Sequence, residues 1–331
     1  MQKKFSILLK YFATLKGVFV KRLSLMNIKP PLLPRGGTIG IIAPSSPAKR
    51  KPLRKGIEYL LSRGYRVRTS PYLTRGRYYL AGSDDLTRVK YLEEFLLDDG
   101  IDCVICARGG YGALRIVDKI NYDKLRKAKP KAFVGYSDIT VIQLAFLRML
   151  NWITYSGPMV ASDMGDDFDA YSEKWFWKVL DGDSYPLELE NPEGMELKVL
   201  KHGRAEGVLI PACLSLMTSL LGTEYMPSLE GTILVIEDID EKSYRLDRLF
   251  QILKLHGIYD KINGLILGQF TKCFTRKSFG LEELLSEVVE KYDFPVVLNL
   301  AYGHVKKRLT LPVGMRASIQ TAPLRIILLG K

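Results

Sequence analysis

Short apolar segments alternate with amphipathic segments in the first half of the chain. The apolar segments show no polar alternation and are rich in strand-forming residues, which is typical of buried strands. They cover residues 38–44, 65–67, 101–107 and 131–136. Helices are predicted by apolar residues at helical spacing or by position after a strand, and they cover residues 51–63, 84–97, 113–118 and 138–150. This order predicts an α/β fold with a parallel sheet that is covered by helices on both faces.

Strands and helices continue in the second half, after a change in composition. The segment after Gly157-Pro158 is acidic and aromatic, and we expect a linker with a short helix over residues 166–197. Beyond it, strands are predicted at residues 231–238, 264–270, 310–319 and 323–329, and helices at residues 243–255 and 282–291. The expected organisation is a first domain over residues 36–165 and a second over residues 198–331.

Length and charge limit the class of protein. The 331 residues carry 49 Lys and Arg against 36 Asp and Glu, a net charge of +13, with 47% hydrophobic residues. This length fits roughly two globular domains, and no apolar stretch is long enough to predict a membrane-spanning helix. A net positive charge makes nucleic acid a candidate partner. A non-catalytic binding protein is therefore one alternative to an enzyme. However, no basic helix, stacking motif or finger spacing supports nucleic-acid binding, and we expect none.

A basic extension is expected over residues 1–35, and nearly half of the net positive charge lies in its first 25 residues. Residues 1–25 contain six Lys and Arg and no acidic residue. Apolar and basic residues alternate there at roughly helical spacing, so this segment could lie on an anionic membrane surface. Lys10 and Lys16 interrupt its apolar region, which disfavours a signal peptide. Two simpler interpretations are a disordered extension and translated sequence upstream of a true start at Met26.

The four cysteines are expected to be structural. Cys103 and Cys106 have the C-x-x-C spacing, but they lie on one predicted strand, where positions i and i+3 face opposite sides of the sheet. They therefore cannot share a metal or redox site. The chain contains only three histidines, so few ligands for a zinc site are present. We expect neither a metal nor another cofactor.

Two glycine-containing turns follow predicted strands and could carry chemistry. The sequence Arg-Gly-Gly-Tyr-Gly at residues 108–112 could expose backbone N–H groups to an anion, although on its own a tight turn is the simpler interpretation. Gly135-Tyr136-Ser137-Asp138 lies where a strand gives way to a helix. This is the arrangement of a nucleophile elbow, which exposes the serine Oγ at a helix N-terminus. The second glycine of the usual G-x-S-x-G pattern is replaced by Ile139, and an ordinary helix cap is the alternative.

A carboxylate and a histidine complete a candidate triad. Glu237 ends the apolar strand GTILVIE, at the edge of an α/β sheet where ligand sites gather. His304 follows another apolar segment and lies in the loop Ala-Tyr-Gly-His. A serine nucleophile needs a base that takes its proton, and the base needs a carboxylate that fixes its tautomer. Ser137, Glu237 and His304 supply these three parts.

Five segments in this order resemble the serine LD-carboxypeptidases, the family that also contains the microcin C self-immunity peptidases. The segments are GGTIGIIAPSSP, YYLAGSDDLTRVKYLEEFLLDDGIDCVICARGGYGALRIVDKI, PKAFVGYSDITVI, GTILVIEDID followed by YRLDRLFQIL, and YGHVKKRLTLPVG. The resemblance as a whole runs from about residue 36 to residue 330. The resemblance implies an α/β N-terminal domain with the nucleophile and a smaller, β-rich α/β C-terminal domain with the carboxylate and the base.

The resemblance also implies roles for residues. It makes Ser137 the nucleophile, Glu237 the carboxylate and His304 the base, with an oxyanion hole formed by the backbone N–H groups of Asp138 and of the Gly109-Gly110 turn. Members of the LD-carboxypeptidase family are usually cytoplasmic, metal-free homodimers that remove the terminal D-alanine from murein tetrapeptides during peptidoglycan recycling. The immunity-type branch, which acts on acyl-adenylate-like amides, is the alternative.

Two positions depart from the family pattern. Pro211-Ala212-Cys213 stands where much of the family has Gly-Gly-Asn, and Ser156 stands where much of it has His before Gly-Pro. Both segments are expected to line the cleft, so they bear on the substrate rather than on the triad.

Overall fold

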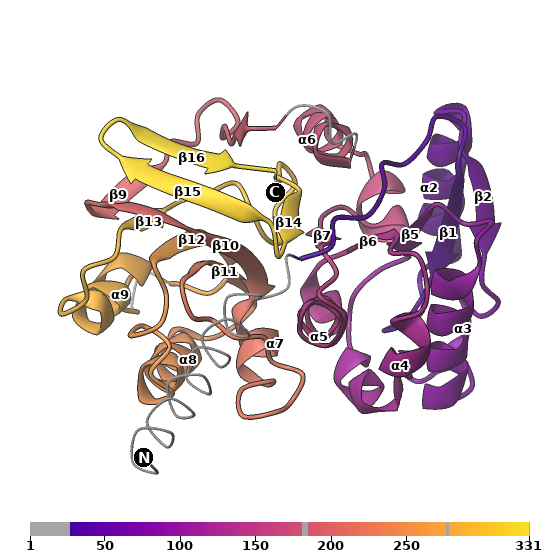
Figure 1. Cartoon of the computed structure of the whole chain (residues 1–331), viewed down its shortest axis with the longest axis horizontal. Helices are drawn as coiled ribbons and strands as arrows, with labels where there is room; N and C mark the ends of the chain where they lie inside the picture. Colours follow the sequence, from indigo (N-terminus) through magenta and orange to yellow (C-terminus); the bar gives the residue numbers. More distant parts are fainter. Residues whose placement is uncertain (1–26, 181–184, 276–277, 331) are drawn as a thin grey trace, which may run out of the picture.

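Two separate β-sheets organise the chain in the computed structural model, which describes residues 27–180, 185–275 and 278–330. The first sheet has six strands in the order β14-β7-β6-β5-β1-β2, and the second has eight in the order β8-β16-β15-β10-β11-β12-β13-β9. Figure 1 shows the sheets on opposite sides of the molecule, with helices α5 (Thr140–Leu150) and α7 (Leu214–Thr218) packed between them. The fold is therefore the predicted mixed α/β class with two sheets.

The first sheet is built from the predicted strands of the first half. Its five parallel strands are β1 (Thr38–Ile42), β2 (Arg66–Thr69), β5 (Cys103–Cys106), β6 (Ala132–Gly135) and β7 (Thr154–Ser156). The helices around it are α2 (Arg50–Ser62), α3 (Asp85–Leu97), the short α4 (Tyr122–Leu125) and α5. Helix α3 begins where the sequence predicts, because the Asp84 carboxylate accepts a hydrogen bond from the Thr87 N–H.

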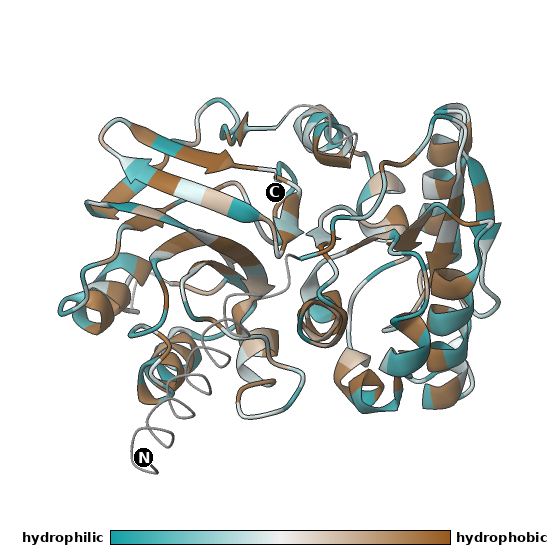
Figure 2. Cartoon of the chain, viewed as in Figure 1, coloured by the Kyte–Doolittle hydropathy of each residue, from teal (hydrophilic) through white to brown (hydrophobic). Residues whose placement is uncertain are grey.

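The residues of β1, β5 and β6 are buried throughout, as the unbroken apolar segments predict, and Figure 2 colours each residue of the chain by its hydropathy. Cys103 packs in one hydrophobic cluster with Ile39 and Ile41, and Cys106 packs in another with Ile42 and Phe133. The prediction that the two C-x-x-C thiols face opposite sides is therefore confirmed.

The second sheet has a parallel centre with antiparallel edges. Strands β10 (Arg204–Cys213), β11 (Thr232–Ile239), β12 (Gly264–Thr271) and β13 (Val296–Leu298) run parallel. Strands β8 (Leu187–Glu188), β9 (Lys198–Lys201), β15 (Arg316–Thr321) and β16 (Leu324–Leu328) pair antiparallel. The helices of this half are α7, α8 (Ser243–Leu255) and α9 (Leu281–Val289). Because β11 and β12 are central, most of their residues are apolar and buried, and their bounds match the prediction closely.

One predicted strand is divided between the two sheets. The sequence predicts a single strand over residues 310–319, but Gly314 adopts a φ of +100° and breaks it. Strand β14 (Leu311–Val313) then pairs with β7 of the first sheet, and β15 pairs with β10 of the second. This crossing joins the two halves. The helix predicted at residues 113–118 is instead two 3₁₀ turns, η1 (Ala113–Arg115) and η2 (Val117–Lys119).

Segments expected outside the domains also contribute to the packed body. Within the expected linker, helix α6 (Ala170–Leu180) buries Trp175 and Phe176 completely. Of the expected basic extension, Ile28 exchanges backbone hydrogen bonds with Asn151 and Ile153, while residues 1–26, with their expected membrane-surface contact, lie outside the described residues. Among the described helices, none is long and apolar enough to cross a bilayer.

A close contact between α2 and the turn η4 (Val160–Met164) gives a stability test. We expect Gly56→Ala to lower the free energy of unfolding by about 2 kcal/mol or more, because a Cβ there would lie 2.0 Å from the Val160 carbonyl oxygen. Urea unfolding would measure the loss. Gly280→Ala is the control, since its Cβ would meet no atom within 4 Å, and equal stability of the two variants would contradict this packing.

Candidate active site

Ser137 lies on a sharp turn between β6 and the helical segment that follows. Its φ is +65°, in the left-handed region that residues other than glycine seldom adopt. The 3₁₀ turn η3 (Ser137–Ile139) begins at this residue and continues into α5. A Cβ at Gly135 would lie 2.8 Å from the Ile139 side chain, so Ile139 makes the glycine before Ser137 necessary. The structure thus has the strand–turn–helix geometry of a nucleophile elbow, with Ser137 half-buried at its tip.

The glycine turn after β5 closes directly over Ser137. A Cβ on Gly109 would lie 3.0 Å from the Ser137 Cβ and 3.2 Å from its Oγ, so only glycine allows this approach. Gly110 has a φ of +114°, and a Cβ there would meet the Ser46 Oγ at 2.3 Å. Among the described residues, the N–H groups of Gly109 and Gly110 have no hydrogen-bond acceptor. These two donors beside a serine hydroxyl can bind an anion.

Asp138 connects the elbow at Ser137 to the neighbouring loops by hydrogen bonds. Its buried carboxylate accepts hydrogen bonds from the Ser45 Oγ at 2.5 Å and from the Ala113 N–H at 2.8 Å. Burial raises the pKa of Asp138, and these hydrogen bonds offset part of that rise. The loops after β1, β5 and β6 therefore meet on one side chain, which fixes the backbone around Ser137.

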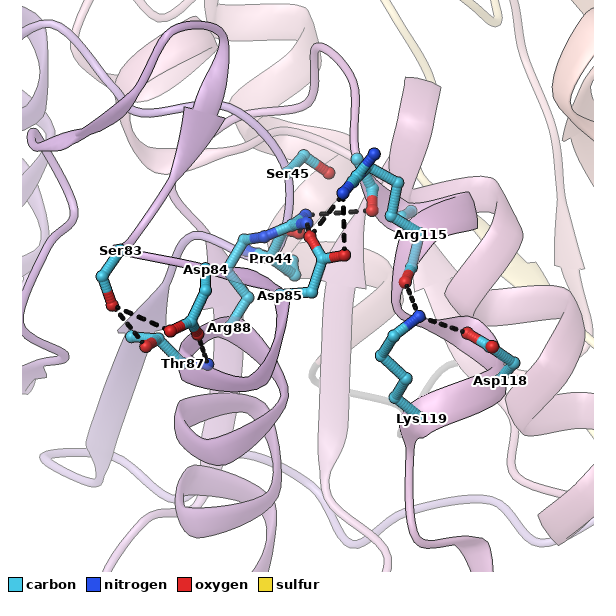
Figure 3. A network of polar contacts seen from close by, with 12 residues as sticks. Pro44, Ser45, Ser83, Asp84, Asp85, Thr87, Arg88, Arg115, Asp118 and Lys119 are labelled. Atoms are coloured by element: carbon cyan, nitrogen blue, oxygen red, sulfur yellow. Dashed lines mark hydrogen bonds and ion pairs between the residues drawn. The ribbon is translucent and has the colours of Figure 1, made fainter.

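A buried arginine, Arg88, also stabilises the glycine turn at residues 108–112. Arg88 on α3 donates from Nη1 to the carbonyl oxygens of Pro44 at 2.6 Å and Gly112 at 2.9 Å, and it also pairs with Asp85 (Figure 3). Asp85 in turn accepts from Arg115 at 3.1 Å. The sequence analysis missed this role, although a basic residue inside the predicted apolar face of a helix could have marked it.

Glu237 and His304 form the second part of the site. Glu237 is 1% exposed at the carboxyl end of β11, and its Oε2 lies 2.7 Å from His304 Nδ1 and 3.2 Å from the His304 backbone nitrogen. Gly303 has a φ of +115°, and a Cβ there would lie 2.6 Å from the same oxygen. With Nδ1 donating to the carboxylate, the neutral imidazole keeps Nε2 as an acceptor. Such a histidine can accept a proton from a neighbouring group.

Tyr136 brings the two parts together. Its ring contacts the His304 ring edge-on with centroids 5.2 Å apart, and the next residue in the chain is Ser137. The guanidinium of Arg308 lies 4.2 Å above the same ring and pairs with Asp163 at 3.0 Å. The predicted candidates from the two halves of the sequence therefore meet at one place. The roles of Tyr136 and Arg308 there were not predicted, because nothing in their local sequence marks a contact between the halves.

Ser156, one of the two departures from the family pattern, links the sheets. Its Oγ lies 2.8 Å from the hydroxyl of Tyr302, and both residues are buried. Ser156 ends β7 of the first sheet, whereas Tyr302 comes just before the Gly303-His304 loop. This hydrogen bond therefore holds the histidine loop against the half that carries the serine.

The other departure, residues 211–213, borders the buried carboxylate. Cys213 is in register with Glu237 on the adjacent strand, and its Sγ lies 3.6 Å from the Asp238 carboxylate. Burial raises the pKa of the Cys213 thiol. Asp238 also accepts a hydrogen bond from the Ser215 N–H at 2.8 Å, at the start of α7. Cys213 thus lies beside the candidate triad residue Glu237, whereas Ser156 contacts Tyr302, two residues before His304. No cluster of three or more His, Cys, Asp or Glu that could hold a metal occurs among the residues that the structure describes.

Known proteins resemble this chain over most of its length. The "Probable murein peptide carboxypeptidase" of Bacillus subtilis is 35% identical to this chain, over 93% of this chain and 95% of the relative's own length. The microcin C7 self-immunity protein MccF of Escherichia coli is 28% identical over 86% of this chain and 90% of its own. In the structural comparison, MccF gives a TM-score of 0.85 at 24% identity, over 91% and 98% of the two chains.

A solved muramoyltetrapeptide carboxypeptidase from Oxalobacter formigenes superposes with a TM-score of 0.76 at 32% identity, covering 87% of this chain and 98% of that one. The family of LD-carboxypeptidases matches in both its parts, the N-terminal domain over residues 39–157 and the C-terminal domain over residues 206–319. With both domains present in order, and with a relative at 35% identity, this chain belongs to the LD-carboxypeptidase family.

Proposed function

We propose that the protein is a serine peptidase in which Ser137, His304 and Glu237 act as a triad. The observation that carries the proposal is the 2.7 Å contact between the buried Glu237 carboxylate and His304 Nδ1, beside the elbow that presents Ser137. Ser137 Oγ attacks the carbonyl carbon and its proton passes to His304 Nε2, while Glu237 stabilises the imidazolium. The backbone N–H groups of Asp138, Gly109 and Gly110 bind the oxyanion.

The rest of the cycle follows from proton balance. His304 returns the proton to the leaving amine, which departs as the C–N bond breaks and leaves an acyl ester on Ser137. Water then attacks the ester and gives a proton to His304, which passes that proton to Ser137 Oγ as the acyl C–O bond breaks. The acid product is released and the free serine is regenerated. Each half-reaction uses the same donors, so one set of residues serves both.

We propose the terminal L,D-peptide bond of murein tetrapeptides as the bond that is cut, with release of D-alanine. The support is the pair of relatives whose names state a murein or muramoyltetrapeptide carboxypeptidase. We place the reaction in peptidoglycan recycling in the cytoplasm, by a homodimer. The four cysteines, all free and buried, fit the reducing compartment that this location implies.

The triad is tested by removing each of its parts. We expect Ser137→Ala and His304→Ala to lower kcat by about 10⁴-fold or more on a murein tetrapeptide, because the nucleophile or its base is gone. Release of D-alanine would be followed by mass spectrometry. Labelling of Ser137 by a fluorophosphonate should disappear in Ser137→Ala, and full activity in both variants would sink the mechanism.

The immunity-type reaction is the second candidate, supported by the likeness to MccF. Side-by-side assays of a murein tetrapeptide and an acyl-adenylate-like amide distinguish the two, because the triad is common to both. Turnover of only the second substrate would reject the murein proposal while leaving the triad in place. Absence of turnover and of serine labelling would favour a binding protein.

The histidine loop allows a sharper test of geometry. Gly303→Ala is expected to lower kcat about 10²-fold, because the new Cβ would lie 2.6 Å from the Glu237 Oε2 and force His304 away. The matched control is Gly257→Ala, which also has a positive φ but lies after α8, with its nearest atom at 3.7 Å. This control should lose stability and keep its kcat. Equal kcat losses in the two variants would contradict the role of Gly303.

The link between the sheets gives a double-mutant cycle. Tyr302→Phe removes the hydroxyl that lies 2.8 Å from the Ser156 Oγ, and we expect a loss of about 3- to 10-fold in kcat. If the two groups act through one hydrogen bond, Ser156→Ala should add little to Tyr302→Phe. Independent, multiplying losses in the double variant would show that the bond does not position His304.

A further inference from the structure

An exposed tyrosine pair lies at the tip of a small hairpin beside the site. Strands β3 (Gly76–Arg77) and β4 (Leu80–Ala81) are joined by Tyr78 and Tyr79 alone. Two-residue hairpin turns favour Asn-Gly, because they require positive φ. Here Tyr78 adopts a φ of +57° although its side chain is 85% exposed. This backbone conformation costs about 1 kcal/mol, and burial of the Tyr78 ring does not offset that cost.

The hairpin is held firmly against the serine site. The Ala81 N–H donates to the Ser45 carbonyl oxygen at 2.9 Å, and the Ala48 N–H donates to the Leu73 carbonyl oxygen at 2.7 Å. Ser45 is the residue whose hydroxyl bonds Asp138. The strained turn at Tyr78 is therefore anchored to the Ser45 loop, which also fixes the backbone around the elbow at Ser137.

The tyrosines continue onto the glycine turn. The Tyr79 ring meets the Tyr111 ring edge-on with centroids 5.4 Å apart, and Tyr111 directly follows Gly110. Both rings are exposed. The guanidinium of Arg77 lies 5.6 Å from the Tyr78 ring. The result is an aromatic surface with phenolic hydroxyls and a cation, a short distance outside the turn that contacts Ser137.

We propose that Tyr78, Tyr79 and Tyr111 bind the sugar that carries the peptide of a murein-derived substrate, and so determine a preference for glycosylated tetrapeptides. An aromatic face packs on the C–H groups of a pyranose ring, while phenol and guanidinium groups hydrogen-bond its hydroxyl and N-acetyl groups. The inference rests on the proposed function for the identity of the peptide, whose cut end occupies the serine site.

Binding to an inactive enzyme tests this surface without turnover. In a Ser137→Ala background, calorimetry would compare N-acetylmuramoyl-tetrapeptide with the same tetrapeptide lacking the sugar. We expect the sugar to tighten Kd about tenfold, in the range of one or two aromatic contacts. Adding Tyr78→Asn and Tyr79→Gly removes both rings, and asparagine tolerates the positive φ at position 78. The chain should therefore still fold, and the two Kd values should become equal.

The control is Tyr244→Ala on α8, where an equally accessible tyrosine, 55% exposed, lies outside the hairpin and the glycine turn. It should keep the tenfold difference. Equal Kd values before the hairpin is changed, or a difference that survives Tyr78→Asn/Tyr79→Gly, would overturn the proposal. Failure of the proposed reaction appears separately, as absence of D-alanine release by the unmodified enzyme with either ligand.

Discussion

A buried carboxylate is the constraint from which the site is built. Glu237 is almost completely removed from water, and an ionised carboxylate in such a place is strongly unfavourable unless donors surround it. The Gly303-His304 loop supplies two of them, the backbone N–H and the imidazole Nδ1. The loop must pass so close that Gly303 has no room for a Cβ. Burial of one charge thus fixes the position of the histidine, its tautomer and the residue before it.

In the first half of the chain, Asp138 is a second buried carboxylate that needs hydrogen-bond donors around it. Its buried carboxylate is stabilised by the Ser45 hydroxyl and the Ala113 N–H, which draw two further loops toward Ser137. In each half, therefore, an acidic side chain at the carboxyl end of a parallel strand organises a glycine loop. The Ser156–Tyr302 hydrogen bond and the Arg308–Tyr136 contact then align one half with the other. Precision comes from satisfying buried polar groups, while the two hydrophobic clusters supply the stability.

The sequence predicts what depends on neighbours along the chain. The apolar strands, the helix that became α3 and the elbow at Ser137 are local patterns, and they were found. Residues 204–213 were not predicted as the strand β10, because Pro211 argues against a central strand. The structure tolerates Pro211 because β15 pairs with β10 only as far as Val208. Contacts between distant segments, such as that of the Tyr136 ring with the His304 ring, leave no local pattern.

Residues other than glycine hold a positive φ at several turns, and two of these turns lie where substrate contact is proposed. Ser137 and Tyr78 both hold positive φ values that glycine or asparagine would adopt at lower cost. At Ser137 the turn exposes a hydroxyl beside two N–H groups that have no acceptor among the described residues. Tyr78 instead turns an aromatic ring into solvent. A strained residue persists only where the surrounding structure determines its conformation, and both turns are anchored through Ser45. One loop after β1 therefore holds both the elbow and the tyrosine hairpin, and this connects the bond to be cut with recognition of the rest of the substrate.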